Sequence, residues 1–107
     1  MANTIQVSAG QLFEIADAAA AKGDQATAER AYEALIGDPS QEIRLEARFR
    51  LAMLEGKRGN LPKATRLLQV ILDHRPDSAR ARVELAILSE NMGIMAEPGA
   101  VKRARTA

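Results

Sequence analysis

The chain has 107 residues, of which 47% are hydrophobic, with one tyrosine, two phenylalanines and neither tryptophan nor cysteine. This length fits one domain with a modest core, and the lack of cysteine excludes disulfides, thiolate metal sites and cysteine nucleophiles. The net charge of +1 argues against general nucleic-acid binding.

Local signals mark out helices from the beginning of the chain. Ser8 and Gln11 fit a capping box, in which each side chain accepts a hydrogen bond from the other residue's backbone N–H. They predict a helix over residues 11–22 that ends at Gly23, a residue suited to a left-handed cap. A second helix, over residues 25–36, follows it directly.

Two longer helices follow, separated by short turns. The apolar spacing of residues 41–57 predicts a third helix, which Gly59 ends. Residues 61–75 predict a fourth helix, because Asn60 can cap its beginning and Pro76 stops its end.

The fifth helix is predicted over residues 79–92, with Asp77 or Ser78 as its cap and Gly93 as its end. Alanine and leucine recur throughout the chain and are strong helix formers, whereas few positions favour strand. The chain is therefore predicted to be all-α, with small side chains that allow close helix contacts.

Two segments of the chain repeat one pattern. "RFRLAMLEGKRGN" (48–60) and "RVELAILSENMGI" (82–94) share five residues, each 34 positions apart. Helix pairs at this period indicate a repeat architecture. The chain resembles tetratricopeptide repeats, which carry a Leu-Gly/Ala pair in helix A, a glycine at the turn, an alanine in helix B and a closing proline. The matching residues are Ile15, Ala16, Gly23, Ala28, Tyr32 and Pro39 in the first repeat, Leu51, Ala52, Gly59, Ala64 and Pro76 in the second, and Leu85, Ala86 and Gly93 in the third. The tryptophan and tyrosine that the family carries in helix A are missing.

The resemblance implies a single domain of antiparallel helix-turn-helix repeats, stacked as a short right-handed α-solenoid of five helices. The first repeat covers about residues 8–39, the second 41–76 and a truncated third 77–95, with a basic tail at 96–107. Where a third helix B would lie, the chain has Pro98 and Gly99, a pair that a helix interior tolerates poorly. The third repeat is therefore predicted to be a lone helix whose apolar face, including Leu85 and Leu88, lacks cover.

The resemblance also implies a binding groove, which the fifth and ninth positions of each helix A line. In this register those positions predict an apolar stripe that suits an apolar peptide or amphipathic helix. Three cations near the same face are expected to select acidic flanking residues. The predicted groove residues are Phe13, Asp17, Phe49, Arg50, Met53, Lys57, Arg80, Val83 and Ile87. The ninth positions lack the asparagine with which the chaperone-binding subfamily clamps a C-terminal carboxylate.

No catalytic constellation, phosphate loop or metal-ligand spacing is recognisable, so the sequence predicts a non-enzymatic protein without cofactor or metal. His74, the single histidine, fits a favourable position near a helix end. Acids alternate with the basic residues of the later half, and Glu46 stands four residues before Arg50, a helix-stabilising pair. We therefore expect no nucleic-acid binding. Without a visible signal peptide or membrane span, we expect a cytoplasmic protein.

Charge is unevenly distributed along the chain. Residues 1–40 carry two basic and six acidic residues, a net of −4, whereas 41–107 carry thirteen and eight, a net of +5. Such polarity favours head-to-tail association or an acidic partner at one end, unless these charges simply solvate the helix surfaces.

Three functional interpretations remain open at this stage. The favoured one is a scaffold or chaperone-like module that binds a protein or peptide, an architecture shared by small export chaperones of bacterial secretion systems. In the second, the apolar stripe packs on the chain's own C-terminal segment, or two copies form a homodimer through the uncapped third repeat. In the third, the chain is a fragment, since "RPDSARARVELA" (75–86) resembles the periplasmic repeat region of outer-membrane surface-lipoprotein assembly proteins.

Overall fold

The computed structural model describes residues 7–96, with side chains described through Asn91. Within that range five helices follow one another and no strand forms: α1 (Ala9–Ala21), α2 (Gln25–Ile36), α3 (Gln41–Lys57), α4 (Leu61–His74) and α5 (Ala79–Ala96). The predicted all-α repeat architecture is confirmed. Pro98, Gly99 and all but the first residue of the predicted basic tail lie outside the described residues.

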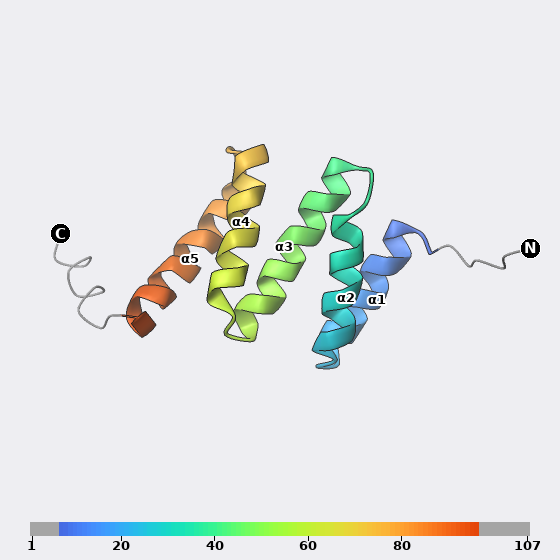
Figure 1. The fold of residues 1–107 in the computed structure, drawn as a ribbon, viewed down its shortest axis with the longest axis horizontal. Helices are drawn as coiled ribbons and strands as arrows, with labels where there is room; N and C mark the ends of the chain where they lie inside the picture. Colours follow the sequence, from blue (N-terminus) through green and yellow to red (C-terminus); the bar gives the residue numbers. More distant parts are fainter. Residues whose placement is uncertain (1–6, 97–107) are drawn as a thin grey trace, which may run out of the picture.

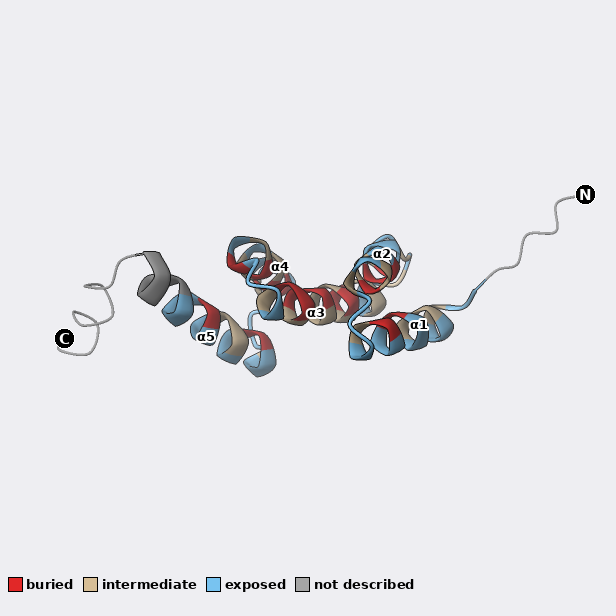
Figure 2. Ribbon diagram, turned by 90° about the horizontal axis from the view of Figure 1, so that it is seen from below, coloured by how far each residue is buried: buried red, intermediate tan, exposed pale blue. Residues whose placement is uncertain are grey.

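The helices stand side by side in a row (Figure 1), and each packs against its neighbours in sequence. Figure 2 shows α2 and α4 on one side of the row, α1 and α5 on the other, and α3 between them. The helices α1, α3 and α5 therefore form a shallow arch that is open on the side away from α2 and α4. None of the helices between residues 7 and 96 combines the length and apolarity that crossing a bilayer requires.

The two turns within helix pairs share one backbone conformation. Gly23 and Gly59 have φ values of +84° and +86°, in the left-handed region that suits glycine. In each turn, the N–H of the residue after the glycine donates to the carbonyl five positions earlier, at 2.8 Å and 2.9 Å. This is the Schellman arrangement that satisfies carbonyls at a helix end. The predicted glycine turns are confirmed at both positions.

Gly93 behaves differently, because α5 continues through it to Ala96. The prediction that the helix ends at Gly93 is wrong. Gly23 and Gly59 are each followed by a polar residue that begins the next helix, whereas Gly93 is followed by Ile94, which has no capping oxygen. At the two turns with left-handed glycines, a residue that starts the next helix directly follows the glycine.

The predicted N-caps are mostly confirmed. The Oγ of Ser8 accepts from the Gln11 N–H at 3.1 Å, and the Gln11 side chain accepts from the Ser8 N–H at 2.9 Å. Asp24 caps α2 and Ser78 caps α5, each accepting from the N–H three residues on, at 3.3 Å and 3.2 Å. Asn60 occupies the N-cap of α4, but its side chain makes no capping bond and donates instead to a buried carboxylate. The prediction of Asn60 as a side-chain cap is therefore wrong.

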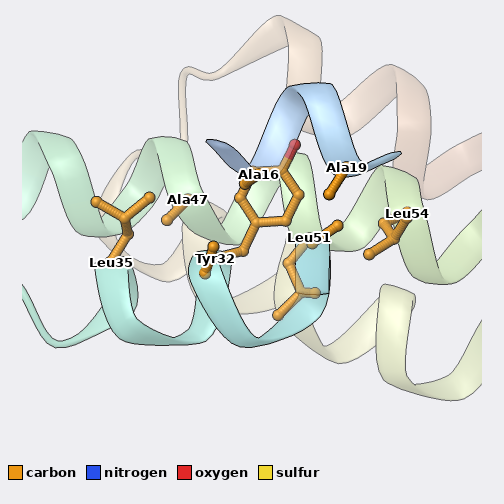
Figure 3. Packing of buried hydrophobic residues seen from close by; sticks show 9 residues of the cluster. Ala16, Ala19, Tyr32, Leu35, Ala47, Leu51 and Leu54 are labelled. Carbon is orange, nitrogen blue, oxygen red and sulfur yellow. The ribbon is translucent and has the colours of Figure 1, made fainter. Parts of the chain in front are cut away.

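The first hydrophobic cluster joins α1, α2 and α3. α1 contributes only the small side chains of Ala16 and Ala19 as buried members, which lets it approach α2 and α3 closely. Figure 3 shows the Tyr32 ring among Ala16, Ala19 and Leu51. The buried members are Ala16, Ala19, Ala28, Ala31, Tyr32, Leu35, Ala47, Leu51 and Leu54.

The second hydrophobic cluster joins α3, α4 and α5, and α5 contributes only Ala81 and Leu88 as buried members. Gly56 of α3 faces Leu88, and a Cβ there would lie 3.4 Å from the Leu88 Cδ2, an ordinary contact distance. The expectation that Leu88 lacks cover is wrong, because 9% of the residue is exposed, and Leu85 is partly buried. The buried members are Leu45, Ala52, Leu61, Ala64, Leu68, Ile71, Ala81 and Leu88.

One charged residue, Glu55 of α3, is completely buried. Its carboxylate lies 3.3 Å from the Lys63 Nζ and 3.6 Å from Arg58, and it accepts a hydrogen bond from the Asn60 amide at 3.3 Å. Lys63 also contacts Glu29 of α2, at 2.7 Å. Hydrogen bonding with the Glu55 carboxyl, and secondly with Lys63, lowers the pKa of Glu29 to about 2. We call these five residues the Glu55 cluster; it joins α2, α3 and α4.

Candidate functional site

The nine residues predicted for the groove all lie on α1, α3 and α5, the helices of the arch. α1 carries Phe13 and Asp17, and α5 carries Arg80, Val83 and Ile87. The remaining four lie on α3. Seven of the nine, together with Glu46, form one connected surface that we call the inner face: Phe13, Asp17, Glu46, Phe49, Arg50, Met53, Lys57 and Arg80.

Arginine side chains cover both phenylalanine rings of the inner face. The Arg50 Cζ lies 4.5 Å from the centre of the Phe13 ring, and the Arg80 Cζ lies 3.7 Å from the centre of the Phe49 ring. A cation–π contact of this kind contributes about 0.5–1 kcal/mol at an exposed site. The stacks join α1 to α3 and α3 to α5. A partner that approaches these rings therefore meets guanidinium groups before it meets apolar surface.

Two carboxylates hold the arginines in place. Glu46 accepts two hydrogen bonds from Arg80, at 3.0 Å and 3.1 Å, and one from the Arg50 Nε at 2.7 Å. Asp17 accepts from the Arg50 Nη1 at 2.8 Å and from the Tyr32 hydroxyl. Burial raises the pKa of Glu46, but Arg80 and Arg50 together outweigh burial, so the net shift of this pKa is downward. The resulting chain of ion pairs crosses all three helices of the arch.

A hollow of about 300 Å³ opens between α1 and α3 beside these ion pairs. Asp17, Arg50, Met53 and Lys57 line it, together with apolar residues of both helices that include Leu54. Met53 is partly exposed, and Lys57 is exposed and has no ion pair with any described residue. The hollow thus combines apolar walls with an ammonium group that is available to an incoming carboxylate.

A second hollow, of about 290 Å³, lies between the first half of α3 and the turn before α5. Phe49, Ile71 and Arg80 are among its lining residues. Arg75, which also lines it, pairs with Glu42. Because both arginines of this hollow already have carboxylate partners, it offers less to a charged ligand than the hollow beside Lys57.

A comparison with protein families bears on this architecture. The family model for the tetratricopeptide repeat matches residues 46–78. Residues 46–78 therefore form a tetratricopeptide repeat. The matched segment starts within α3, includes α4 and ends at the N-cap of α5, so it covers most of the second predicted repeat. In two further comparisons, no curated protein and no solved structure matches the chain.

Two ion pairs of the chain follow the 34-residue period of the sequence. Glu46 and Arg80 are 34 residues apart, and so are Glu29 and Lys63. Equivalent residues of successive repeats stack on each other, so opposite charges one period apart become neighbours. Among the ion pairs of the inner face, only that of Glu46 with Arg50 within one helix was predicted, and it is confirmed. The inter-repeat pairs had a sequence signal, namely opposite charges separated by one repeat.

Val83 and Ile87 line neither of the two hollows. Both are largely exposed on α5, at 55% and 48% of their surface. Their role in the groove stays a prediction.

His74 lies at the end of α4, with its Nδ1 3.0 Å from the Val70 carbonyl oxygen. No metal-binding group of three or more His, Cys, Asp or Glu side chains occurs within the described residues.

Proposed function

We propose that the chain is a non-enzymatic protein-binding module, a scaffold whose inner face holds a segment of a partner protein. Tetratricopeptide repeats are protein-interaction units, which supports the general class. The observation that carries the specific proposal is the hollow between α1 and α3, where Met53 and the exposed Lys57, which has no ion pair within residues 7–91, both line the wall. The partner segment is extended or helical and brings apolar side chains next to an acidic one.

The charges of the inner face favour an acidic partner at Lys57 in particular. A carboxylate that pairs with Lys57 breaks no ion pair among the described residues, whereas one that pairs with Arg80 must displace Glu46 from two hydrogen bonds. Met53 supplies an unbranched, polarizable side chain that adapts to partners of different shape. Selection for acidic residues is therefore assigned chiefly to Lys57, and Arg50 and Arg80 contribute less than the sequence predicted.

Selection from a random dodecapeptide display library tests this assignment without a known partner. The immobilised chain should enrich peptides that place an aspartate or glutamate beside apolar residues. Lys57→Glu should weaken binding of the enriched peptides at least about tenfold, the loss of one charge-assisted contact of about 1.4 kcal/mol. Arg66→Glu is the matched control, because Arg66 is exposed on α4 and lies outside the inner face.

Two results would contradict the proposed function. Failure to enrich any peptide over repeated rounds would remove the support for a peptide-binding face. Enrichment of peptides that bind the Lys57→Glu chain as tightly as the unmodified chain would move the binding surface away from this hollow. Circular dichroism of both variants establishes that the helices are retained.

A further inference from the structure

The outer edge of α5 is the part of the described fold with the least cover. α4 and α3 contact the opposite edge of α5, where Ala81 and Leu88 are buried. Exposed residues at helical spacing follow this edge from position 82 to position 90, about two helical turns. Figure 2 shows exposed segments along α5 in pale blue. We call this set the α5 stripe: Arg82, Val83, Ala86, Ile87 and Glu90.

The centre of the α5 stripe suits close contact with another helix. Ala86 is small, so it lets a second helix approach closely. Val83 and Ile87, on either side of it along the helix, are two of only four large hydrophobic residues that are exposed in the described part of the chain. An apolar contact is therefore available around Ala86, with room for the partner's backbone.

The charges of the stripe are arranged symmetrically about Ala86. Arg82 lies one turn before Ala86 and Glu90 one turn after it, about 6 Å along the axis in each direction. Both side chains are exposed, and neither has an ion pair within residues 7–91. Arg80, two residues from Arg82, is by contrast paired with Glu46 and stacked on Phe49.

We infer that the α5 stripe binds the α5 stripe of a second copy of this chain, with the two helices antiparallel and a twofold axis at Ala86. In that arrangement, a residue a given distance before Ala86 meets the residue the same distance after Ala86 in the other copy. Arg82 of each chain therefore meets Glu90 of the other, and two equivalent ion pairs form. Val83 and Ile87 of each chain pack around Ala86 of the other.

A second copy is favoured over a different occupant because the stripe is complementary to itself. A parallel helix of the same sequence would place arginine against arginine and glutamate against glutamate, which is destabilising. A contact of two single helices is small compared with stable protein interfaces, so the dimer should be weak and dependent on concentration. This inference is independent of the inner face, which lies on other residues of α5 and on α1 and α3.

Sedimentation equilibrium over a wide concentration range tests the inference. The chain should pass from a mass of 11.6 kDa toward twice that value as its concentration rises. Arg82→Glu and Glu90→Arg should each weaken the dimer at least about tenfold, because each places like charges opposite one another twice. Arg66→Glu, an exposed change of the same charge on α4, should leave the dimer unchanged.

The decisive step is an equimolar mixture of the Arg82→Glu chain with the Glu90→Arg chain. Each variant alone has only like charges across the twofold axis, but the mixture has opposite charges at both contacts. The mixture should therefore recover dimers to near the unmodified affinity, as should the double variant carrying both changes.

Three outcomes would overturn the inference. A mass of 11.6 kDa at every concentration would mean that the stripe does not bind a second copy, as expected if residues 97–107 cover it. A dimer that both variants leave unchanged would use another surface. A dimer that dissociates in high salt, but that mixing the two variants does not restore, would indicate head-to-tail contact between the acidic and basic halves of the chain.

Discussion

The helices α3 and α5 carry the same sequence pattern but occupy different environments. α3 has α2 on one side and α4 on the other, whereas α5 has a helix on one side only within the described chain. Ala52 of α3 is 1% exposed, and the equivalent Ala86 of α5 is exposed. Glu55 of α3 is completely buried, and the equivalent Ser89 is exposed.

The positions that remain equivalent show the cause of this difference. Ala47 and Ala81 are both fully buried, and Leu54 and Leu88 are buried to nearly the same extent. These positions face a neighbour in both repeats. Burial in a repeat protein is thus decided by which neighbour is present, because each repeat contacts only the adjacent ones. The same motif contributes different amounts of stability in its two copies.

The largest expected difference is between Leu51→Ala and Leu85→Ala. Leu51 is 1% exposed, so its truncation leaves a cavity and should lower the free energy of unfolding by about 3 kcal/mol. Leu85 is only partly buried, and its truncation should cost about 1 kcal/mol. Urea unfolding followed by circular dichroism measures both values. Equal losses of unfolding free energy in the two variants would contradict the difference in burial between α3 and α5, since they would require α5 to be covered as fully as α3.

A second matched pair is Glu55→Ala and Ser89→Ala. The Glu55 carboxylate accepts from Asn60 and lies beside Lys63 and Arg58, so its removal should lower the free energy of unfolding by about 2 kcal/mol. Ser89→Ala, at the equivalent exposed position, should change it by no more than about 0.5 kcal/mol. The same urea titration applies. A neutral Glu55→Ala would mean that the Glu55 cluster does not join the repeats energetically.

The Glu55 cluster should also make stability depend on pH. The pKa of Glu29 in the folded chain is about 2, below its ordinary value of 4.5. The folded state therefore favours the ionised form of Glu29 more strongly than the unfolded state does. The resulting stabilisation is complete well above pH 4.5 and is lost as the pH falls from about 4.5 toward 2. The difference in unfolding free energy between the unmodified chain and Glu29→Gln should therefore shrink over this window. A difference that stays constant from pH 6 to pH 2 would exclude this linkage.

Local signals in the sequence predicted most of the helix boundaries. The helix ends that were predicted depend on hydrogen bonds between residues close in sequence, as at Ser8 with Gln11, at Asp24 and at the two left-handed glycines. The local sequence therefore contains enough information to locate these helix ends. Asn60 failed as a predicted cap because a buried carboxylate, visible only in the packed structure, takes its side-chain amide.

The inner face was only partly predictable for a related reason. The repeat register placed Phe13 and Phe49 at equivalent groove-lining positions of successive helices A. Nothing in that register shows that Arg50 and Arg80 lie over their rings. Stacking depends on how far successive repeats are rotated, which the pattern of one repeat does not determine. The pairing of Glu46 with Arg80 was more accessible, because the two charges are separated by one repeat.

The smallest expected difference in the free energy of unfolding is between variants of two arginines of α5. Arg80 is stacked on Phe49 and paired with Glu46, whereas Arg82 has neither contact within the described chain. At concentrations where the chain is monomeric, Arg80→Met should lower the free energy of unfolding by about 1 kcal/mol, and Arg82→Met by less than about 0.5 kcal/mol. High salt should reduce the cost of Arg80→Met, because it screens the ion pair that the variant lacks. Equal costs in low salt would show that the ion pairs of the inner face do not hold α5 against α3, and the apolar contacts of Ala81 and Leu88 would then have to position the helix.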